Sequence, residues 1–474
     1  MPKFKPIENY AGYFLAIDPS AQFEEDSIEK LVNRYVEEKV NIEKFEKNYN
    51  NDEKGARAIN PKVILKVVFY SYIKGIQSLR KMEEMTKNHI AYIYLTGNMV
   101  IDHTTIAKFL TKNRDEIASI FSELLIVMNE LGMIDWSRIV IDGTKIKGNA
   151  SKDLTGDIKR FEKKLEQYKE LSRKLILRSE KLEKDESIEY KEKEKERDKI
   201  ERQSKKYESV IKKIEGYKKE VEEGKVDGNK QINLTDRESA LLKTMNGFIQ
   251  GYNVQTTLSN NDIIVNIEAT NESNDSAFLE KMLKKTENIK EALNVKEKTE
   301  YSLDRGYFNS EGIVNIEKEG ISVYVPIPSN VKEEGLRKGI KIEKEGENLW
   351  LILENGKKVK GHKKKDRNKY RYNFYWKEDC KQKHVSIVTT FIDEKETWER
   401  YVRKMESEEG KMKYNRRIGK EHNFDTLKNV IGLSRIRRRG IEKANLEAVL
   451  AAIAYNLCKF LSFMVENKLT WAKI

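Results

Sequence analysis

The sequence predicts a mixed α/β protein, and three observations support this fold class. Short apolar runs alternate with amphipathic segments between residues 138 and 328. Residues 25–130 carry helical periodicity, and residues 154–226 consist almost entirely of Lys, Glu, Arg, Leu and Ile. Strands and helices that alternate along a chain are typical of an α/β sheet with helices packed on it.

The composition favours an acidic partner. The 474 residues include 91 Lys and Arg against 78 Asp and Glu, a net charge of +13, and nucleic acid is the commonest partner of a basic protein. The cysteines, Cys380 and Cys458, are far apart, which excludes a disulfide scaffold and a Cys-rich zinc module. The most apolar stretch, residues 446–465, contains Glu447, Asn456 and Lys459, so it predicts a buried helix rather than a membrane span.

Several short helices are predicted over residues 25–130. Asn60-Pro61 precedes an apolar run and predicts one helix start, Ser78 predicts a second, and Asp102 or Thr104 a third. Short helices that are basic on one side resemble a helix-turn-helix DNA-binding module. An ordinary helical bundle fits the same pattern nearly as well.

The sheet is expected to begin after residue 138. Residues 139–141 predict a short strand that ends at Asp142 and Gly143. Residues 247–259 and 262–270 predict two strands of a hairpin. A helix over 274–290, a strand that ends at Asp304, a second helix and a last strand should follow.

Two segments interrupt this pattern. Residues 154–228 have the composition of long helices and predict a charged hairpin or coiled-coil-like arm. Residues 335–395 are strand-like, and residues 356–371 carry nine Lys or Arg and one Asp. Aromatic residues alternate with these cations, which suits contact with phosphates and stacking on bases, although a solvated hairpin with an aromatic inner face fits equally well. Residues 411–443 carry a further net charge of +8, so the positive charge is concentrated, which favours a binding groove.

Two aspartates are candidate metal ligands because they follow predicted strands. Asp142 is followed directly by Gly143, and Asp304 is followed two residues later by Gly306. Ligands gather at the ends of strands in open α/β sheets. Two acids in one pocket repel each other, and a hard divalent cation such as Mg²⁺ removes that cost. Turn aspartates are the alternative interpretation of both residues.

A third acid lies in a predicted helix over residues 411–429. At about 100° per residue, four side chains fall on one narrow stripe of this helix: Tyr414, Arg417, Glu421 and Lys428. Glu421 could therefore complete the metal site, with two cations and an aromatic ring beside it. A solvated helix face with ordinary ion pairs is the alternative.

These motifs resemble the DDE (Asp-Asp-Glu) transposases of bacterial insertion sequences, in the group marked by Tyr-x2-Arg-x3-Glu-x6-Lys. That pattern is complete in this chain at Tyr414, Arg417, Glu421 and Lys428. The first acid matches in "VIDGTKIKGNA" and the second in "SLDRGYF". The resemblance extends from about residue 15 to residue 465.

The resemblance implies an α/β fold with an RNase-H-like catalytic core. The core would comprise residues 131–153 and 229–334, and a helical DNA-binding domain would precede it at 1–130. Residues 154–228 would be a charged helical insertion, and residues 335–395 a basic β-rich insertion. Residues 396–474 would form the C-terminal helices that carry the third acid.

The resemblance also implies an enzyme that cuts the ends of an insertion sequence and joins them to target DNA by two-metal-ion phosphoryl transfer. Asp142, Asp304 and Glu421 would be catalytic and would hold Mg²⁺, with Mn²⁺ as a substitute. The implied DNA contacts are Arg417 and Lys428 on phosphates, Tyr414 on the terminal nucleotide, and Lys145 and Lys147 on the backbone.

The implied partner is double-stranded DNA, both the terminal inverted repeats and the target. The protein is expected to act as a homodimer on DNA in the bacterial cytoplasm, at the nucleoid, and not at a membrane. Two other functions stay open: a catalytically silent DNA-binding protein derived from such an enzyme, and an RNase-H-like nuclease without strand transfer.

Overall fold

The computed structural model describes residues 18–49, 58–184, 190–328, 341–346, 348–353, 355–366, 369–378, 381–388, 395–417 and 424–467. The chain divides into two compact units. The first comprises Met1–Val127, Val430–Gly432 and Leu450–Ile474, and the second comprises Met128–Asn429 and Leu433–Val449.

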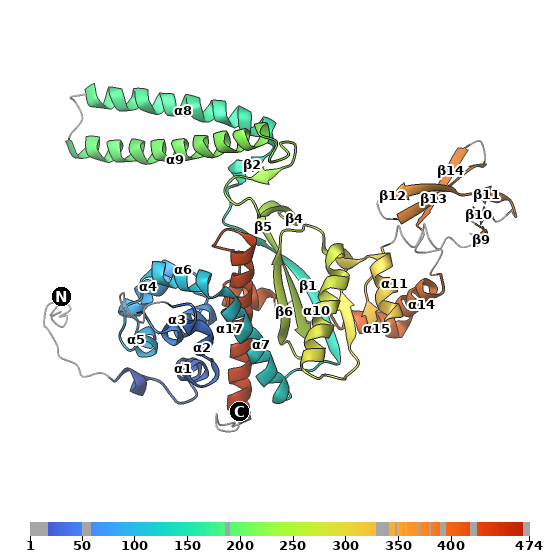
Figure 1. Ribbon diagram of the computed structural model, residues 1–474, viewed down its shortest axis with the longest axis horizontal. Helices are drawn as coiled ribbons and strands as arrows, with labels where there is room; N and C mark the ends of the chain where they lie inside the picture. Colours follow the sequence, from blue (N-terminus) through green and yellow to red (C-terminus); the bar gives the residue numbers. More distant parts are fainter. Residues whose placement is uncertain are drawn as a thin grey trace, which may run out of the picture. The chain divides into compact units, whose positions relative to one another are not determined.

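The first unit is helical (Figure 1). Its helices are α1 (Ile28–Lys39), α2 (Glu43–Glu46), α3 (Pro61–Ile73), α4 (Leu79–Asn88), α5 (Ile90–Thr96), α6 (His103–Lys112), most of α7 (Arg114–Glu130) and the second part of α17 (Ile441–Glu466). α3 is buried on almost every side, as its apolar sequence predicts. In the same unit, the rings of Tyr35 and Phe460 pack edge to face at 6.4 Å.

Two of the three expected helix starts are capped as the sequence predicts. Asn60 accepts a hydrogen bond from the Lys62 backbone nitrogen at 2.8 Å, with Pro61 as the first residue of α3. Asp102, rather than Thr104, caps α6 by accepting from the Thr104 nitrogen at 2.8 Å. Ser78 precedes α4 without a side-chain cap. The helical stretch that begins after Asp102 is divided at Asn113 into α6 and α7.

The second unit contains the sheet, and the mixed α/β class is confirmed. Its strands are β1 (Arg138–Lys147), β4 (Ala240–Thr244), β5 (Gly247–Ser259), β6 (Ile264–Thr270), β7 (Glu300–Leu303) and β8 (Ser322–Tyr324). The order is β4-β5-β1-β7-β8, and β6 also pairs with β5. β1 is antiparallel to β5 and parallel to β7, and β7 is parallel to β8.

The helices that follow the hairpin strands pack on this sheet (Figure 1). They are α10 (Leu279–Ala292) and α11 (Ser310–Lys318). The short 3-10 helix η3 (Asp275–Phe278) comes directly before α10. The Asn266 side chain on β6 donates to the Met282 sulfur on α10 at 3.7 Å. The hairpin of β5 and β6 turns at Asn260-Asn261-Asp262, where Asp262 has a positive φ of 68°. Residues of this type tolerate such a backbone, which explains why the sequence revealed the turn.

The prediction for the first strand is wrong in its length. The strand was expected to end at Asp142, but β1 continues to Lys147. Pairing with β5 causes the extension, because the antiparallel register runs without a break from Ile139 to Lys147. Asp142 is therefore an internal residue of β1.

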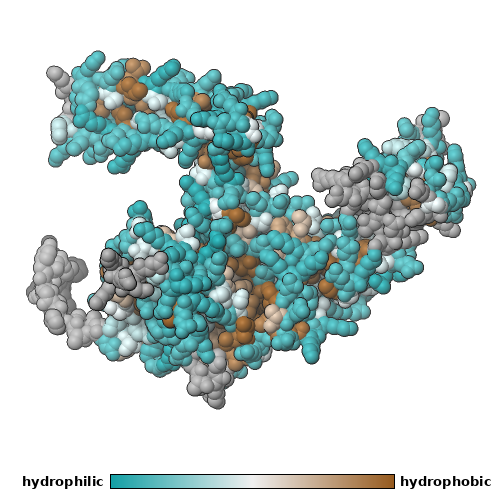
Figure 2. Space-filling model, viewed as in Figure 1, coloured by the Kyte–Doolittle hydropathy of each residue, from teal (hydrophilic) through white to brown (hydrophobic). Residues whose placement is uncertain are grey.

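Between β1 and β4 the chain forms two long helices, α8 (Ile158–Lys184) and α9 (Tyr190–Glu222). β2 (Thr155–Gly156), just before α8, pairs with β3 (Ile232–Asn233), which follows α9, so a short two-stranded sheet closes the base of this helical hairpin. The helices run side by side (Figure 1). The rings of Phe161 and Tyr217 pack at 5.5 Å between them. Figure 2 shows hydrophobic patches on this hairpin, and its exposed large apolar side chains are Leu171, Ile176, Leu177 and Tyr190.

A basic β-rich segment lies between β8 and the last helices. Its strands are β9 (Lys341–Glu345), β10 (Asn348–Ile352), β11 (Lys358–Lys360), β12 (His362–Asp366), β13 (Lys369–Glu378) and β14 (Lys381–Val388). Tyr372 and Phe374 are buried in its own small core, where Trp376 packs against them. The expectation that these rings could stack on bases is therefore wrong for Tyr372 and Phe374, because the segment needs them as its core. Tyr375 is exposed.

After this segment come α14 (Lys395–Glu406), α15 (Glu408–Asn415), a short π-helix at Thr426–Val430 and α17. Among the described residues, α17 alone is long and apolar enough to cross a membrane, and 72% of its most apolar window is buried. This burial agrees with the prediction of a buried helix over residues 446–465.

Candidate active site

Asp142 and Asp304 lie on neighbouring parallel strands. The last paired residues of β1 and β7 are Ile141 and Leu303, and each aspartate comes directly after its member of this pair. The apolar residues before them are completely buried and fix both strands in the core. The parallel register therefore brings together two acids that are 162 residues apart in the sequence.

The guanidinium of Arg417 bridges the two carboxylates. Its Nη1 lies 3.4 Å from Asp142 Oδ2, and its Nη2 lies 3.4 Å from Asp304 Oδ1. The Arg417 side chain is only 16% exposed, whereas the Asp142 and Asp304 side chains are 24% and 49% exposed. Arg417 Nη1 is buried and makes no hydrogen bond to any residue that the structure describes. The arrangement is a two-carboxylate site whose repulsion one cation offsets.

The expected single helix over residues 411–429 is wrong. α15 ends at Asn415, and Arg416 and Arg417 form a turn. Glu421, the predicted third acid, lies outside the described residues. Tyr414 is in the last turn of α15, and its ring centre is 5.8 Å from the Arg417 guanidinium carbon. Lys428 lies in the π-helix and forms no ion pair with a described residue.

Burial dominates the electrostatics of Asp142. It raises the pKa of the Asp142 carboxyl to about 6, and the negative charges of Asp304 and Asp275 raise it too. Arg417 and the Gly143 backbone nitrogen, which donates to Asp142 Oδ1 at 2.9 Å, lower the same pKa. Near neutral pH the site thus holds a charged, largely desolvated carboxylate, which suits a cationic ligand.

Asp142 should make stability depend on pH. The pKa is about 6 in the fold against a usual 3.8, so the folded state binds the proton more tightly, and stability is lost as pH rises through about 6. In EDTA, Asp142→Asn should therefore stabilise the protein at pH 7.5 by up to about 3 kcal/mol, and hardly at all at pH 4. Thermal unfolding midpoints of both proteins across this range measure the effect. A variant that is less stable at pH 7.5 would show that burial does not penalise this charge.

Behind Gly143 lies a polar network that sequence reasoning missed. Asp275 Oδ1 accepts from Asn253 Nδ2 at 2.6 Å and from Gln255 Nε2 at 2.8 Å. The Tyr307 hydroxyl donates to Gln255 Oε1. Gln255 is the cross-strand partner of Gly143, so this network supports the strand directly next to Asp142. Gly143 was the one available signal, because a strand glycine often marks a close approach of other groups.

A side chain at residue 143 would collide with this network. A Cβ there would lie 2.6 Å from Gln255 Nε2 and 3.1 Å from both Asp275 Oδ1 and the Tyr307 oxygen. We expect Gly143→Ala to destabilise the protein by about 1–3 kcal/mol, as overpacking does. Gly216→Ala is the control: a Cβ on this helical glycine of α9 would meet no described atom within 4 Å apart from the adjacent backbone of its own helix, so the variant should gain roughly 0.5–1 kcal/mol of stability. Urea denaturation measures both, and a neutral Gly143→Ala would mean that the network gives way freely.

Lys145 and Lys147 do not join the carboxylates. Successive side chains of a strand point to opposite faces, so these two lysines lie on the Gly143 face of β1 and not on the Asp142 face. Lys145 Nζ donates to the Lys243 carbonyl at 2.9 Å. Lys147 is exposed at the end of the strand.

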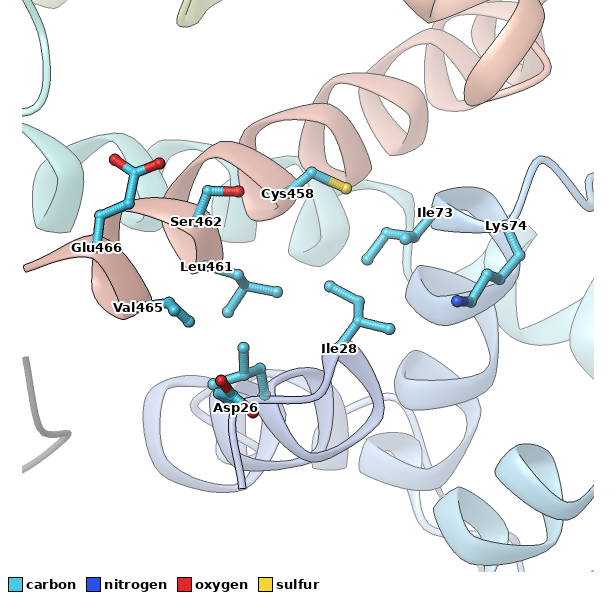
Figure 3. A pocket seen from close by; sticks show the side chains of 10 residues that line it. Asp26, Ile28, Ile73, Lys74, Cys458, Leu461, Ser462, Val465 and Glu466 are labelled. Atoms are coloured by element: carbon cyan, nitrogen blue, oxygen red, sulfur yellow. The ribbon is translucent and has the colours of Figure 1, made fainter. Parts of the chain in front are cut away.

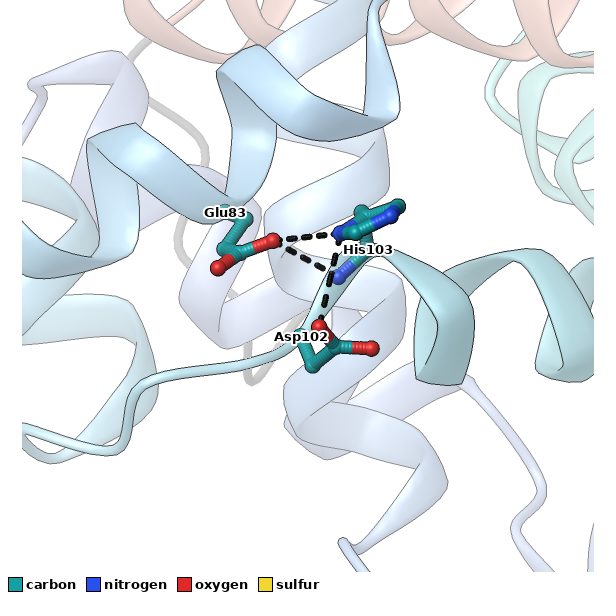
Figure 4. Close-up of side chains that lie close together, drawn as sticks. All are labelled: Glu83, Asp102 and His103. Carbon is teal, nitrogen blue, oxygen red and sulfur yellow. Dashed lines mark hydrogen bonds and ion pairs between the residues drawn. The ribbon is translucent and has the colours of Figure 1, made fainter.

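A group in the first unit has the residue types of a metal site, but its ligand atoms are already bonded. Atoms of Glu83, Asp102 and His103 lie within 4.8 Å of one another (Figure 4). Glu83 also accepts from Lys87 Nζ, and hydrogen bonds from Lys87 and His103 lower the pKa of Glu83 to about 2. Asp102 caps α6. We interpret the group as a clamp between α4 and α6.

A pocket in the first unit is mainly apolar. Ile28, Leu31, Leu461 and Val465 line it, with Cys458 at one side (Figure 3). Burial raises the pKa of the Cys458 thiol, which makes it a weak nucleophile. Asp26, Lys74 and Glu466 also line the pocket, whereas Asp142 and Asp304 belong to the other unit.

Comparison with known families matches both units. Residues 18–112 match a family model described as "Transposase domain (DUF772)", and residues 241–457 match "Transposase DDE domain". No curated protein and no solved structure matches the chain. DDE transposases act on DNA and generally use divalent metal ions. Two transposase domains in this order, the second of which contains Asp304 and Arg417, show that the chain belongs to the insertion-sequence DDE transposases.

Proposed function

We propose that this transposase cuts DNA at the ends of its insertion sequence and joins the freed 3′ ends to target DNA. Asp142 and Asp304 are the proposed first two acids of the DDE set, and Glu421 is the third. The observation that carries the proposal is the placement of Asp142 and Asp304 after the last pair of two parallel strands, within reach of one guanidinium.

We also propose that the sheet is an RNase-H-like core. An antiparallel strand, β5, and a parallel strand, β7, flank β1, and the acids follow the parallel pair, which supports this assignment. The helical hairpin α8–α9 and the β9–β14 segment are then insertions into the core. Their positions before β4 and before α14 agree with the order of segments expected from the sequence.

The donor set fits a divalent cation. Carboxylate oxygens are the ligands that Mg²⁺ and Mn²⁺ prefer, and the Asp142 charge is desolvated enough to need a cation close by. Two such ions, when bound, activate the attacking oxygen and stabilise the leaving oxygen of an in-line phosphoryl transfer. Asp142 and Asp304 would hold the ions, and Glu421 follows Arg417 by only four residues.

Arg417 has two proposed tasks. Without a bound cation, its guanidinium offsets the repulsion between the two aspartates. With DNA present, its planar fork suits two oxygens of the phosphate at the cut. We propose that Tyr414, whose ring lies next to Arg417, packs on the terminal nucleotide, and that Lys428 contacts a neighbouring phosphate.

We propose a homodimer as the active form on DNA. The apolar side chains that α8 exposes, Leu171, Ile176 and Leu177, support contact with a second copy. Light scattering of a chain without residues 154–228 tests this idea. A deletion variant that still forms a dimer would assign dimerisation to another surface.

The proposed reaction can be tested with duplexes that carry the DNA flanking the gene. The purified protein should nick these duplexes in Mg²⁺ or Mn²⁺, but not in EDTA, and should join the cut ends to a second duplex. DNA binding without nicking in Mn²⁺ would favour a catalytically silent DNA-binding protein. Nicking without joined products would favour a nuclease that lacks strand transfer.

A further inference from the structure

We propose that Arg435, Arg437 and Arg439, here called the arginine ridge, bind the phosphate backbone of double-stranded DNA away from the cut. The ridge belongs to the second unit and comes between the π-helix and α17. The proposal rests on the proposed function, because the DNA in question is the duplex that the carboxylate site would cut.

The ridge is built on the end of β1. Arg435 pairs with Lys147 in a parallel bridge, and the Ile436 nitrogen donates to the Lys147 carbonyl at 2.8 Å. Ile436 is completely buried, whereas Arg435 and Arg437 on either side of it are exposed. Side chains of an extended chain alternate in direction, so an inward Ile436 turns its neighbours outward.

A buried glutamate holds this segment in place. The Glu447 side chain on α17 is 3% exposed and accepts from the backbone nitrogens of Arg437 at 2.8 Å and Arg438 at 2.9 Å. It also accepts from Arg438 Nε at 3.0 Å. A buried carboxylate is costly unless it is bonded in this way. Glu447 thus fixes the backbone and pairs with Arg438, but it neutralises none of the three ridge arginines.

Asn149 orients the ridge from the other side. Its Oδ1 accepts from Arg435 Nη2 at 3.3 Å, and its carbonyl accepts from Arg439 Nε at 3.0 Å. Its Nδ2 donates to the Arg437 carbonyl at 2.8 Å. One neutral side chain and its backbone therefore position two guanidinium groups without cancelling their charge.

Asp236 Oδ1 accepts from the Gly440 nitrogen at 3.2 Å and Glu238 Oε2 from the Ile441 nitrogen at 3.0 Å, so two carboxylates lie close to Arg439 in the part of the chain that the structure describes, but neither forms an ion pair with it. None of the three arginines forms an ion pair there, although Arg438 between them does. Arg435 lies opposite Lys147, and like charges directly opposite each other are destabilising. Exposed cations that lie close together without ion-pair partners attract an anionic ligand.

Duplex DNA fits this arrangement better than a small anion. The guanidiniums of Arg435 and Arg439 both bond to Asn149, and Arg437 lies between these two residues in the chain, so the ridge presents several cations close together beside the end of β1 rather than a single one. Its guanidinium forks suit a row of phosphates. Five residues of strand separate Asp142 from Lys147, which is about 17 Å. The ridge should therefore contribute to DNA affinity and not to the chemical step.

The test is the salt dependence of binding to a labelled 30-base-pair duplex of arbitrary sequence, measured by fluorescence anisotropy with the full chain. Each phosphate contact contributes roughly 0.9 to the slope of log K against log salt. The triple variant Arg435→Gln, Arg437→Gln, Arg439→Gln should lower the magnitude of this slope by about 2–3 and weaken binding at least about tenfold. Its single-turnover cleavage rate at saturating protein should equal that of the wild type.

Two control variants distinguish an effect of the ridge itself from an effect of the protein's total charge. The triple variant Lys284→Gln, Lys296→Gln, Lys298→Gln removes the same charge from exposed sites and should keep the slope. The triple variant with Arg→Lys at the three ridge positions should retain most of the salt dependence of the wild type. An unchanged slope in the ridge variant, or an equal loss in the lysine control, would overturn the proposal. Should the triple variant not fold, Arg437→Gln alone should lower the slope by about 1, because the Arg437 side chain makes no hydrogen bond to a described residue. The slope does not depend on cleavage, so failure of the proposed reaction would be recognised separately.

Discussion

Asp142→Asn should abolish metal-dependent DNA cleavage and leave DNA binding intact. The substitution keeps the size of the side chain and removes the charge that would hold a divalent cation after the last β1–β7 pair. Metal stabilisation of a phosphoryl-transfer transition state is worth several kcal/mol, so the rate should fall by at least about 10³-fold. Single-turnover cleavage in Mn²⁺ and a gel-shift titration on the same duplex measure the two properties.

Asp262→Asn is the matched control for this variant. It makes the same chemical change on the same unit, in the β5–β6 turn, where asparagine accepts the positive φ as readily as aspartate. We expect full cleavage activity from it. If Asp142→Asn still cuts DNA at more than about a tenth of the wild-type rate, the role assigned to Asp142 is wrong.

Arg417→Gln should lower the maximal cleavage rate by about 10²–10³-fold, the usual cost of losing one group that stabilises transition-state charge. The same change removes the cation that now lies between Asp142 and Asp304. At pH 8, well above the pKa of about 6 of the Asp142 carboxyl, a divalent ion should then meet less competition from a protein cation. The Mn²⁺ concentration for half-maximal activity should therefore stay the same or fall while the maximal rate drops.

The maximal cleavage rate and the Mn²⁺ requirement together distinguish two roles of Arg417: contact with the DNA phosphate and positioning of the two aspartates. Arg417→Lys should recover only part of the rate, because an ammonium cannot match the planar fork. Arg416→Gln, at the exposed neighbouring residue, should behave like the wild type. A maximal rate that survives in Arg417→Gln, together with a raised Mn²⁺ requirement, would show that Arg417 only orders the two aspartates.

Local patterns predicted the elements that carry the first two acids. Residues 139–141 are an apolar run followed by an acid, and Glu300–Leu303 alternates polar and apolar residues before Asp304; both patterns are typical of strands. The length of β1 was not predictable in the same way. It depends on the antiparallel partner β5, which lies more than 100 residues away in the sequence.

The surroundings of Asp142 could not be predicted from the sequence. Asn253, Gln255, Asp275 and Tyr307 come from three different elements, and no spacing connects them with Gly143. The prediction of one helix over residues 411–429 was wrong although the local pattern supported it. Its periodicity is suitable, but α15 ends at Asn415, and the turn that follows brings the Arg417 guanidinium to the two aspartates.

Anomalous diffraction from crystals of the full chain with DNA and Mn²⁺ tests the central claim most directly. The account predicts manganese peaks with oxygens of Asp142, Asp304 and Glu421 all among the ligands, at about 2.0–2.6 Å. Peaks at this site that leave out Asp142 or Asp304, or a Glu421 carboxylate that stays away from the ions with DNA bound, would contradict it.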